Sequence, residues 1–191
     1  MFENVVEILV EESSMKNLLE IILPKILPDG YELSINCFVR PHQGKSDLQK
    51  SVPKKVKAYQ YFPQQVKLIV IHDQDSNDCK EIKNTIVTLI ERENDQQSYL
   101  IRIACRELEN WYLGDMNAIE NVYPKFKASK HKNKAKYRNP DNVSGSDEMS
   151  KLIDIFSKGF ASREIPKHMN LDENNSPSFN HLISGVKRFL N

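Results

Sequence analysis

The chain has 191 residues, and its 27 Lys and Arg residues against 26 Asp and Glu residues give a formal net charge of +1. This balance excludes a uniformly basic nucleic-acid-binding protein, and a hydrophobic share of 39% is typical of a soluble globular domain. No apolar run approaches the roughly 18 residues that a membrane-spanning helix needs, and the first residues show no signal-peptide pattern. Three widely spaced cysteines (Cys37, Cys79 and Cys105) favour neither disulfides nor a zinc site. We therefore expect a cytoplasmic protein that does not contact a membrane.

The charges are distributed unevenly along the chain. Residues 40–67 contain seven basic residues and one acidic residue, and residues 125–138 contain seven basic residues and no acidic one. The other 149 residues therefore carry a net charge of −12. Such segregation bears on the partners of a protein and not on its fold.

Strands and helices are predicted to alternate over the first 120 or so residues. The strands are expected at residues 5–10, 31–39, 67–71 and 99–104, and the helices at residues 13–27, from Ser46 onward, at 79–92 and at 107–113. Ser13 or Ser14 is a predicted N-cap of the first helix, and Pro24 should kink or divide that helix. Asp78 is placed to cap the third helix, and Leu108 and Trp111 are expected to pack inward.

The second part of the chain is more polar. Residues 125–147 read as a long basic loop, and two further helices are expected at residues 149–160 and 179–190. We predict an α/β fold with a mostly parallel sheet of about four strands, flanked by helices and followed by a C-terminal helical extension. Residues 1–124 would form the α/β core and residues 125–191 the basic loop and helical extension, which packs on the core within a single domain.

Acidic residues follow three of the four predicted strands. Glu11 follows the first strand, Asp73 and Asp75 the third, and Glu107 and Glu109 the fourth. Ligands of parallel α/β sheets bind at the carboxyl ends of the strands, where these carboxylates would meet. Clustered carboxylates need a proton or a cation, and their oxygen atoms suit Mg²⁺ or Mn²⁺. On an extended segment, Asp73 and Asp75 would project the same way and share one ion.

These residues resemble the Toprim fold of topoisomerases, primases and overcoming-lysogenization-defect nucleases. In that fold a Glu ends the first strand and an Asp-x-Asp ends the third, although Glu12 stands here where Toprim proteins usually have Gly. A closer resemblance, over most of the chain, is to the Toprim-like domain-of-unknown-function family 4276. It rests on five motifs: Val10-Glu11-Glu12, His42-x-Gly44-Lys45-x-Asp47-Leu48, His72-Asp73-Gln74-Asp75-x-x-Asp78-Cys79, Glu107-Leu108-Glu109-Asn110-Trp111-Tyr112-Leu113-Gly114-Asp115 and Ser176-Pro177-Ser178-Phe179. The resemblance implies a bacterial phage-defence protein with an ABC-type or AAA-type ATPase as its partner.

The leading functional hypothesis is metal-dependent hydrolysis of a phosphodiester. Asp73 and Asp75 would bind Mg²⁺ or Mn²⁺, and Glu11 would act as a further ligand or as a general base. Glu109, or with less support Glu107, would hold a second ion; the alternative is that both acids only stabilise the start of a helix.

Two further residues near the acids need an assignment. Lys45 lies in a Gly-containing loop at the same edge of the sheet and would neutralise the scissile phosphate. The alternative is a solvated charge. His72 should point away from Asp73 and Asp75 and play a supporting or core role.

The basic segment 125–138 is the predicted nucleic-acid-binding region. Its charges belong to Lys125, Lys127, Lys130, Lys132, Lys134, Lys136 and Arg138. Lysine and arginine bind phosphate backbones through counterion release, and the interleaved Phe126 and Tyr137 would stack on bases. The alternative is a flexible, solvated loop.

We therefore predict a Mg²⁺- or Mn²⁺-dependent nuclease acting on DNA or RNA such as tRNA, with an ATPase partner. The alternative is a non-catalytic subunit that binds nucleic acid or a nucleotide. The substrate and the formation of a homo-oligomer are left open by the sequence.

Overall fold

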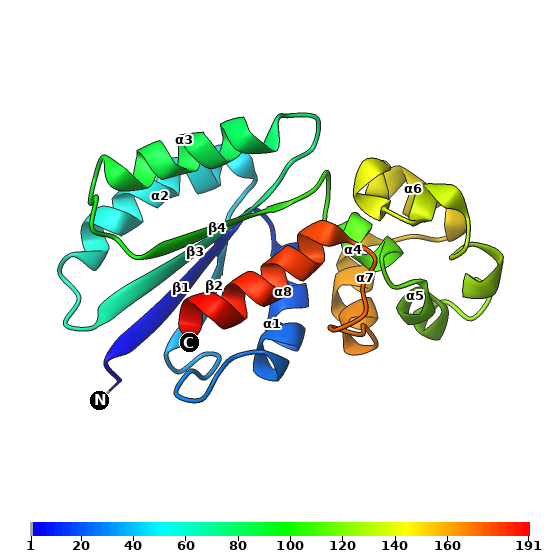
Figure 1. Ribbon diagram of the computed structural model, residues 1–191, viewed down its shortest axis with the longest axis horizontal. Helices are drawn as coiled ribbons and strands as arrows, with labels where there is room; N and C mark the ends of the chain where they lie inside the picture. Colours follow the sequence, from blue (N-terminus) through cyan, green and yellow to red (C-terminus); the bar gives the residue numbers. More distant parts are fainter. Residues whose placement is uncertain (1) are drawn as a thin grey trace.

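A four-stranded parallel sheet forms the centre of the molecule (Figure 1). The computed structural model describes residues 2–191. The strands are β1 (Asn4–Val10), β2 (Cys37–Pro41), β3 (Gln65–Asp73) and β4 (Tyr99–Ala104), in the order β2-β1-β3-β4. Every neighbouring pair is parallel. The predicted α/β class, with a four-stranded parallel sheet and flanking helices, is confirmed.

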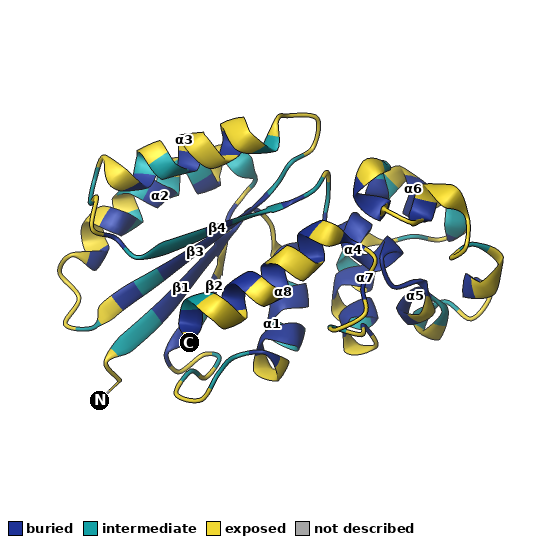
Figure 2. Ribbon diagram, viewed as in Figure 1, coloured by how far each residue is buried: buried dark blue, intermediate teal, exposed yellow. Residues whose placement is uncertain are grey.

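Helices cover both faces of the sheet. Helices α2 (Lys45–Tyr59) and α3 (Cys79–Glu91) lie on one face, and α1 (Ser13–Ile22) and α8 (Pro177–Leu190) lie on the other (Figure 1). Successive residues of a strand point to opposite faces, so β1, β3 and β4 each contribute to two apolar cores. On β3, Leu68 and Val70 pack in the core beneath α2 and α3, whereas Ile69 and Ile71 pack in the core beneath α1 and α8. Both central strands are therefore buried along most of their lengths (Figure 2).

Short helices occupy the space beyond the carboxyl ends of the strands (Figure 1). They are α4 (Glu109–Leu113), α5 (Met116–Val122), α6 (Gly145–Leu152) and α7 (Lys158–Glu164), with 3-10 turns at Ala128–Lys130, Ala135–Tyr137, Pro140–Asn142 and Ile165–Lys167. A further 3-10 turn, Leu23–Lys25, directly follows α1. Helix α7 packs against α1, and α8 packs against β4. Trp111 and Phe179, both fully buried, meet edge to face with ring centroids 5.6 Å apart. The last third of the chain is thus joined to the sheet by direct packing.

Several local predictions are confirmed. Strand β4 has the predicted bounds, Pro24 lies in the 3-10 turn that ends α1, and Leu108 and Trp111 are buried. The side chain of Asp78 accepts hydrogen bonds from the backbone N–H groups of Lys80 and Glu81, as its predicted capping role requires.

The predicted N-cap of α1 is wrong. The capping position belongs to Glu12, whose side chain makes no capping hydrogen bond, and Ser13 and Ser14 are already helical.

The predicted strand at residues 31–39 is wrong in its first half, because β2 begins only at Cys37. Ser34 has a φ of +66°, which an extended strand does not allow. The Asn36 side chain closes this turn, accepting from Glu32 N at 2.8 Å and donating to the carbonyl of Gly30 at 2.8 Å. A buried polar side chain thus overrides the apolar alternation of the sequence.

The predicted helix at residues 149–160 is also wrong, since two helices, α6 and α7, occupy this region. Helix α6 begins earlier, at Gly145, where Ser146 N donates to the Glu107 carboxylate at 2.7 Å. Ile153 is extended, with φ −121° and ψ 115°, and the Ser157 side chain caps α7. The contact with Glu107 is long-range, which is why local periodicity misplaced the helix start.

Among the described residues, no helix combines the length and the apolar character needed to cross a membrane.

Replacing Asn110 with Ala tests how the extension is joined to the core. Asn110 is fully buried, and its amide donates to the carbonyls of Pro140 at 2.6 Å and Val143 at 2.9 Å. We expect Asn110→Ala to lower the free energy of unfolding by about 3 kcal/mol, because both carbonyls lose their partner. Urea denaturation measures the change. The matched control is Asn121→Ala on the exposed side of α5, for which we expect a change below about 0.5 kcal/mol; equal effects would contradict the prediction.

Candidate functional site at the carboxyl edge of the sheet

The carboxyl ends of the strands form one edge of the sheet, here called the carboxyl edge. Strands β1 and β3 are adjacent, and Val10 lies opposite Ile71 in their register. Glu11 and Asp73 therefore emerge side by side, and the backbone N–H of Asp73 donates to Glu11 Oε2 at 3.4 Å. The two acids therefore lie next to each other at this edge, as the strand ends predicted.

The carboxylate of Asp73 is in an unusual environment. Its Oδ1 atom is buried and has no hydrogen-bond partner among residues 2–191. Burial, followed by the charges of Glu11 and Glu109, raises the pKa of Asp73 well above its usual range. Burial also raises the pKa of Glu11, although the neighbouring His72 opposes this effect. The two acids together favour binding of a proton or a cation.

His72 supports Glu11 from beneath. The ring is 1% exposed, with Nδ1 2.6 Å from the carbonyl of Asp73 and 3.3 Å from Glu11 Oε2. Since a carbonyl can only accept, Nδ1 carries the hydrogen, and in the neutral ring Nε2 is free to accept from the Gln49 amide 3.4 Å away. His72 is therefore a buried residue whose ring lies beside the Glu11 carboxylate.

Asp75 does not share an orientation with Asp73. Strand β3 ends at Asp73, and Asp75 has a φ of +52°, so the segment is not extended. The carboxylate of Asp75 forms an ion pair with Lys45. The prediction that Asp73 and Asp75 project the same way is therefore wrong, because the backbone turns between them.

A short loop after β2 brings Lys45 to the carboxyl edge. The backbone N–H groups of His42 and Gly44 donate to the carbonyls of Val10 and Glu11, both at 3.0 Å. The buried His42 ring donates through Nδ1 to the same Val10 carbonyl at 2.9 Å. Gly44 has a φ of +90°, a conformation that favours glycine. The hydrogen bond to Asp75 raises the pKa of Lys45, which keeps the amine cationic.

Glu109 and Glu107 lie on the extension side of the edge. Glu109 is 2% exposed, and Lys158 Nζ of α7 lies 3.6 Å from its Oε1. Glu107 accepts from Ser146 N, so one of its oxygens has a structural role. Burial raises the pKa of Glu109, while Lys158 opposes the shift. Burial alone would lower the pKa of Lys158, yet the surrounding carboxylates, Glu109 first, raise it.

Two residues near this cluster were not singled out from the sequence. Tyr112 is fully buried, its hydroxyl has no partner in the described part of the chain, and burial followed by the charges of Glu109 and Asp73 raises its pKa. Lys158 is the first residue of α7, whereas the sequence placed it near the end of the helix predicted at residues 149–160. A tyrosine at helical spacing is indistinguishable from a core residue, and only the tertiary fold reveals that its hydroxyl faces acids.

The site fits a divalent cation only in part. Within residues 2–191 no three His, Cys, Asp or Glu side chains are grouped closely enough to hold a metal ion. Mg²⁺, however, is usually bound by one or two protein carboxylates together with water and substrate phosphate. Glu11 and Asp73 are such a pair, and the unpartnered Asp73 Oδ1 is an oxygen that a cation would satisfy. Asp75 and Glu109 are instead paired with Lys45 and Lys158.

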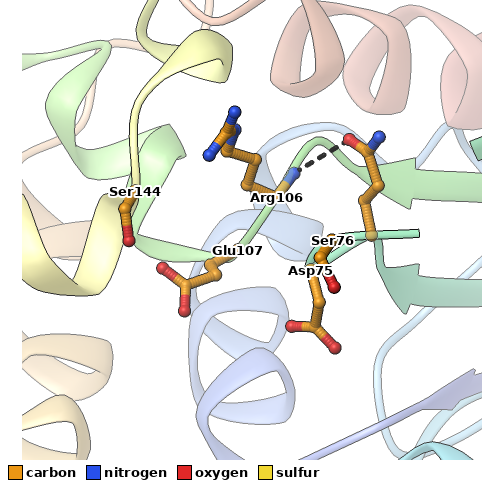
Figure 3. Close-up of a pocket in the computed structure, with 6 residues that line it drawn as sticks. Asp75, Ser76, Arg106, Glu107 and Ser144 are labelled. Atoms are coloured by element: carbon orange, nitrogen blue, oxygen red, sulfur yellow. Dashed lines mark hydrogen bonds between the residues drawn. The ribbon is translucent and has the colours of Figure 1, made fainter. Parts of the chain in front are cut away.

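A cavity of about 450 Å³ opens between the loops that follow β3 and β4 (Figure 3). It is lined by Gln74, Asp75, Ser76, Arg106, Glu107 and Ser144. Arg106 has a φ of +62° and its backbone N–H donates to Gln74 Oε1 at 3.2 Å, the dashed contact in Figure 3. A non-glycine residue in this conformation carries strain, which is frequent at functional sites. The cavity lining therefore contains a positive side chain, Arg106, and two negative ones, Asp75 and Glu107, that a polar ligand could contact.

The side chains of the basic segment 125–138 are only in part placed as the sequence predicted. All seven cationic side chains are exposed, but Lys127 pairs with Glu120 and Lys136 with Glu148. Phe126 and Tyr137 are 5% and 1% exposed, and the Tyr137 hydroxyl donates to Glu148 at 2.7 Å. The prediction that both rings stack on bases is wrong, because they anchor the segment to the protein.

The fold and this edge define an α/β protein with buried carboxylates at the carboxyl ends of a parallel sheet. Residues 10–187 match the family described as a domain of unknown function (DUF4276). Since the match spans most of the chain, the protein belongs to that family. Searches of curated proteins and of solved structures found no match.

Replacing Asp73 with Asn tests the charge balance of the edge. Because the folded-state pKa of Asp73 is raised, the folded protein retains a proton that the unfolded chain has lost, and stability falls as pH rises from the unfolded pKa towards the folded one. The slope is up to about 1.4 kcal/mol per pH unit for each proton. In chelator, we expect Asp73→Asn to be more stable than the wild type at about pH 8 and to gain less at about pH 5.

Urea denaturation at both pH values measures this difference. The control is Asp95→Asn in the exposed turn before β4, which should follow the wild-type pH dependence. A loss of stability in Asp73→Asn at the higher pH would refute the assigned environment.

Proposed function

We propose that this protein is a metal-dependent phosphodiesterase that acts on nucleic acid. The observation that carries the proposal is the buried, unpartnered Asp73 Oδ1 next to Glu11 at the carboxyl edge, with a cationic lysine close by. Buried acids with raised pKa values at such an edge are typical of sites where charge is neutralised by a ligand. The half-buried Lys45 and the exposed Arg106 supply positive charge for a phosphate group beside them.

In this proposal Glu11 and Asp73 hold the Mg²⁺ or Mn²⁺ ion. A bound divalent cation would supply Lewis-acid activation of the phosphate and of a water molecule. Glu11 would either remain a ligand of this ion or act as the general base that accepts a proton from the attacking water. His72 Nδ1 lies 3.3 Å from Glu11 Oε2. Lys45, now paired with Asp75, would bind a phosphate oxygen.

The wider context of the activity rests on the resemblance described above. It supports DNA or RNA as the substrate and an ABC-type or AAA-type ATPase as the partner in phage defence. The residues of the carboxyl edge all come from this chain, so the isolated chain without an ATPase is suited to a first assay of metal binding and cleavage.

The activity test compares cleavage of labelled DNA and tRNA in Mg²⁺, in Mn²⁺ and in chelator. We expect Glu11→Gln and Asp73→Asn to lower the cleavage rate by at least about 100-fold, because each removes a ligand or a base. Lys45→Met should lower the rate by about tenfold through the loss of one phosphate contact. Asp95→Asn is the control and should cleave like the wild type.

A second readout follows metal binding without turnover. Mn²⁺ should raise the unfolding temperature of the wild type and not that of Asp73→Asn, because only a ligand that binds the folded state stabilises it. Cleavage that survives in both acid variants would refute the site. Nucleic-acid binding in excess chelator, with no cleavage of any substrate and no stabilisation by metal, would favour a non-catalytic binding subunit instead.

A further inference from the structure

A second, larger cavity of about 720 Å³ runs along β4, between α3 and α8, and is here called the β4 groove. Strand β4 is an edge strand that pairs only with β3. The cations lining the groove come from distant parts of the sequence: Lys80 and Lys83 of α3, Arg102 of β4, Arg106 of the following loop and Arg188 of α8. The fold therefore assembles a cationic groove that no single segment of the sequence contains.

These five cations lack acidic partners. None of them forms an ion pair within residues 2–191. The single acidic side chain in the lining is Asp141, which is 9% exposed. Its two oxygens accept from Ser176 Oγ at 2.6 Å and from Ser178 N at 2.8 Å. Asp141 is thus committed to the protein, and the positive charge of the groove is left for a ligand.

Arg102 is held in place within the groove. Its Nε donates to the carbonyl of His181 at 2.9 Å and its Nη1 to the carbonyl of Ile101 at 2.9 Å. Gly185 makes room for it, because a Cβ atom there would lie 2.1 Å from Nη2. Burial and then the nearby charge of Arg188 lower the pKa of Arg102. The charges of these two guanidinium groups repel each other, and an anion bound near both would relieve the repulsion.

The β4 groove leads to the proposed active site. Gln74 and Arg106 line both the groove and the smaller cavity that contains Asp75 and Glu107. A ligand in the groove that extends past Arg106 would therefore reach the carboxyl edge. Such a ligand must carry anionic groups over the length of the groove, since the cations are distributed from α8 and α3 to the loop after β4.

We propose that the β4 groove binds the phosphate backbone of a nucleic-acid strand and directs it to the carboxyl edge. The inference deepens the proposed function, on which the role of the strand as substrate rests, but binding in the groove does not require hydrolysis. A β-strand from a second protein chain suits this edge less well. Two backbone groups that an added strand could use are already bonded. The Ile101 carbonyl accepts from Arg102 Nη1, and Cys105 N donates to Ser178 Oγ at 3.2 Å.

The test measures binding of a fluorescently labelled single-stranded oligonucleotide by anisotropy, in chelator so that no cleavage occurs. The variant is Lys83→Gln with Arg188→Gln, two exposed side chains on opposite walls of the groove. We expect its Kd to rise at least tenfold. The slope of log K against log salt should fall by about 1.4, because about 0.7 is lost for each phosphate contact on a single strand.

The matched control is Lys54→Gln with Lys57→Gln, which removes the same charge from the exposed side of α2. Its Kd should stay within twofold of the wild type, and circular dichroism should show that both double variants are folded. Inorganic tripolyphosphate at equal total phosphate should compete at least tenfold less well than unlabelled strand. Equal competition would overturn the assignment to a strand. So would unchanged binding by the groove variant, an equal loss in the control, or no binding by the wild type.

The two proposals can fail separately. If binding depends on the groove but no metal supports cleavage, the hydrolytic function fails and the groove assignment stands. If cleavage requires Asp73 while the groove variant binds and cleaves like the wild type, the groove assignment fails and the hydrolytic function stands.

Discussion

The Asp73 carboxylate sets the main physical constraint on this fold. It ends the central strand β3, and one of its oxygens is buried without a hydrogen-bond partner in the described chain. An unpaired buried charge costs several kcal/mol, so the carboxylate must share a proton or a cation with its surroundings. Helix α4 brings Glu109 and Tyr112, and helix α7 brings Lys158, within reach of the charge at this strand end. The same packing that completes the core therefore creates the electrostatic demand at the edge.

The loops around this carboxylate are held by backbone geometry as much as by side chains. Gly44, Asp75 and Arg106 each have a positive φ, and each lies just after one of three different strands. Gly44 N donates to the carbonyl of Glu11, and Asp75 N donates to the carbonyl of Arg106 at 2.7 Å. Loops fixed in this way keep charged side chains in place before a ligand arrives, which reduces the ordering entropy lost on binding. Two of the three positions carry a side chain with more strain than glycine would have, as is common where a loop serves a ligand.

The sequence predicted the layers of the fold well and their connections less well. Runs of β-branched residues and helical periodicity identified the strands and the helices around the sheet, because a single buried face determines each pattern. The start of β2 and the break after α6 were missed, since they depend on the Asn36 side chain and on the contact between Ser146 and Glu107. At the site, strand order was enough to bring Glu11 and Asp73 together. The orientation of Asp75 was not predictable, because it follows from a backbone turn that periodicity does not encode.

The distribution of charge in the folded protein was even harder to predict from the sequence. The near-neutral total conceals two basic segments that are visible in the sequence, and in the second of these Lys127 and Lys136 are paired with acids. The cations of the β4 groove are spread over residues 80–188 and form no basic run in the sequence. They are free of acidic partners because strand order and helix packing, not sequence proximity, decide their neighbours. Whether a phosphate backbone is attracted to a protein depends on unpaired charge in a shared groove, which a linear count of lysines and arginines does not measure. In this fold the groove beside the edge strand gathers such charge next to the cavity that Asp75 and Glu107 line.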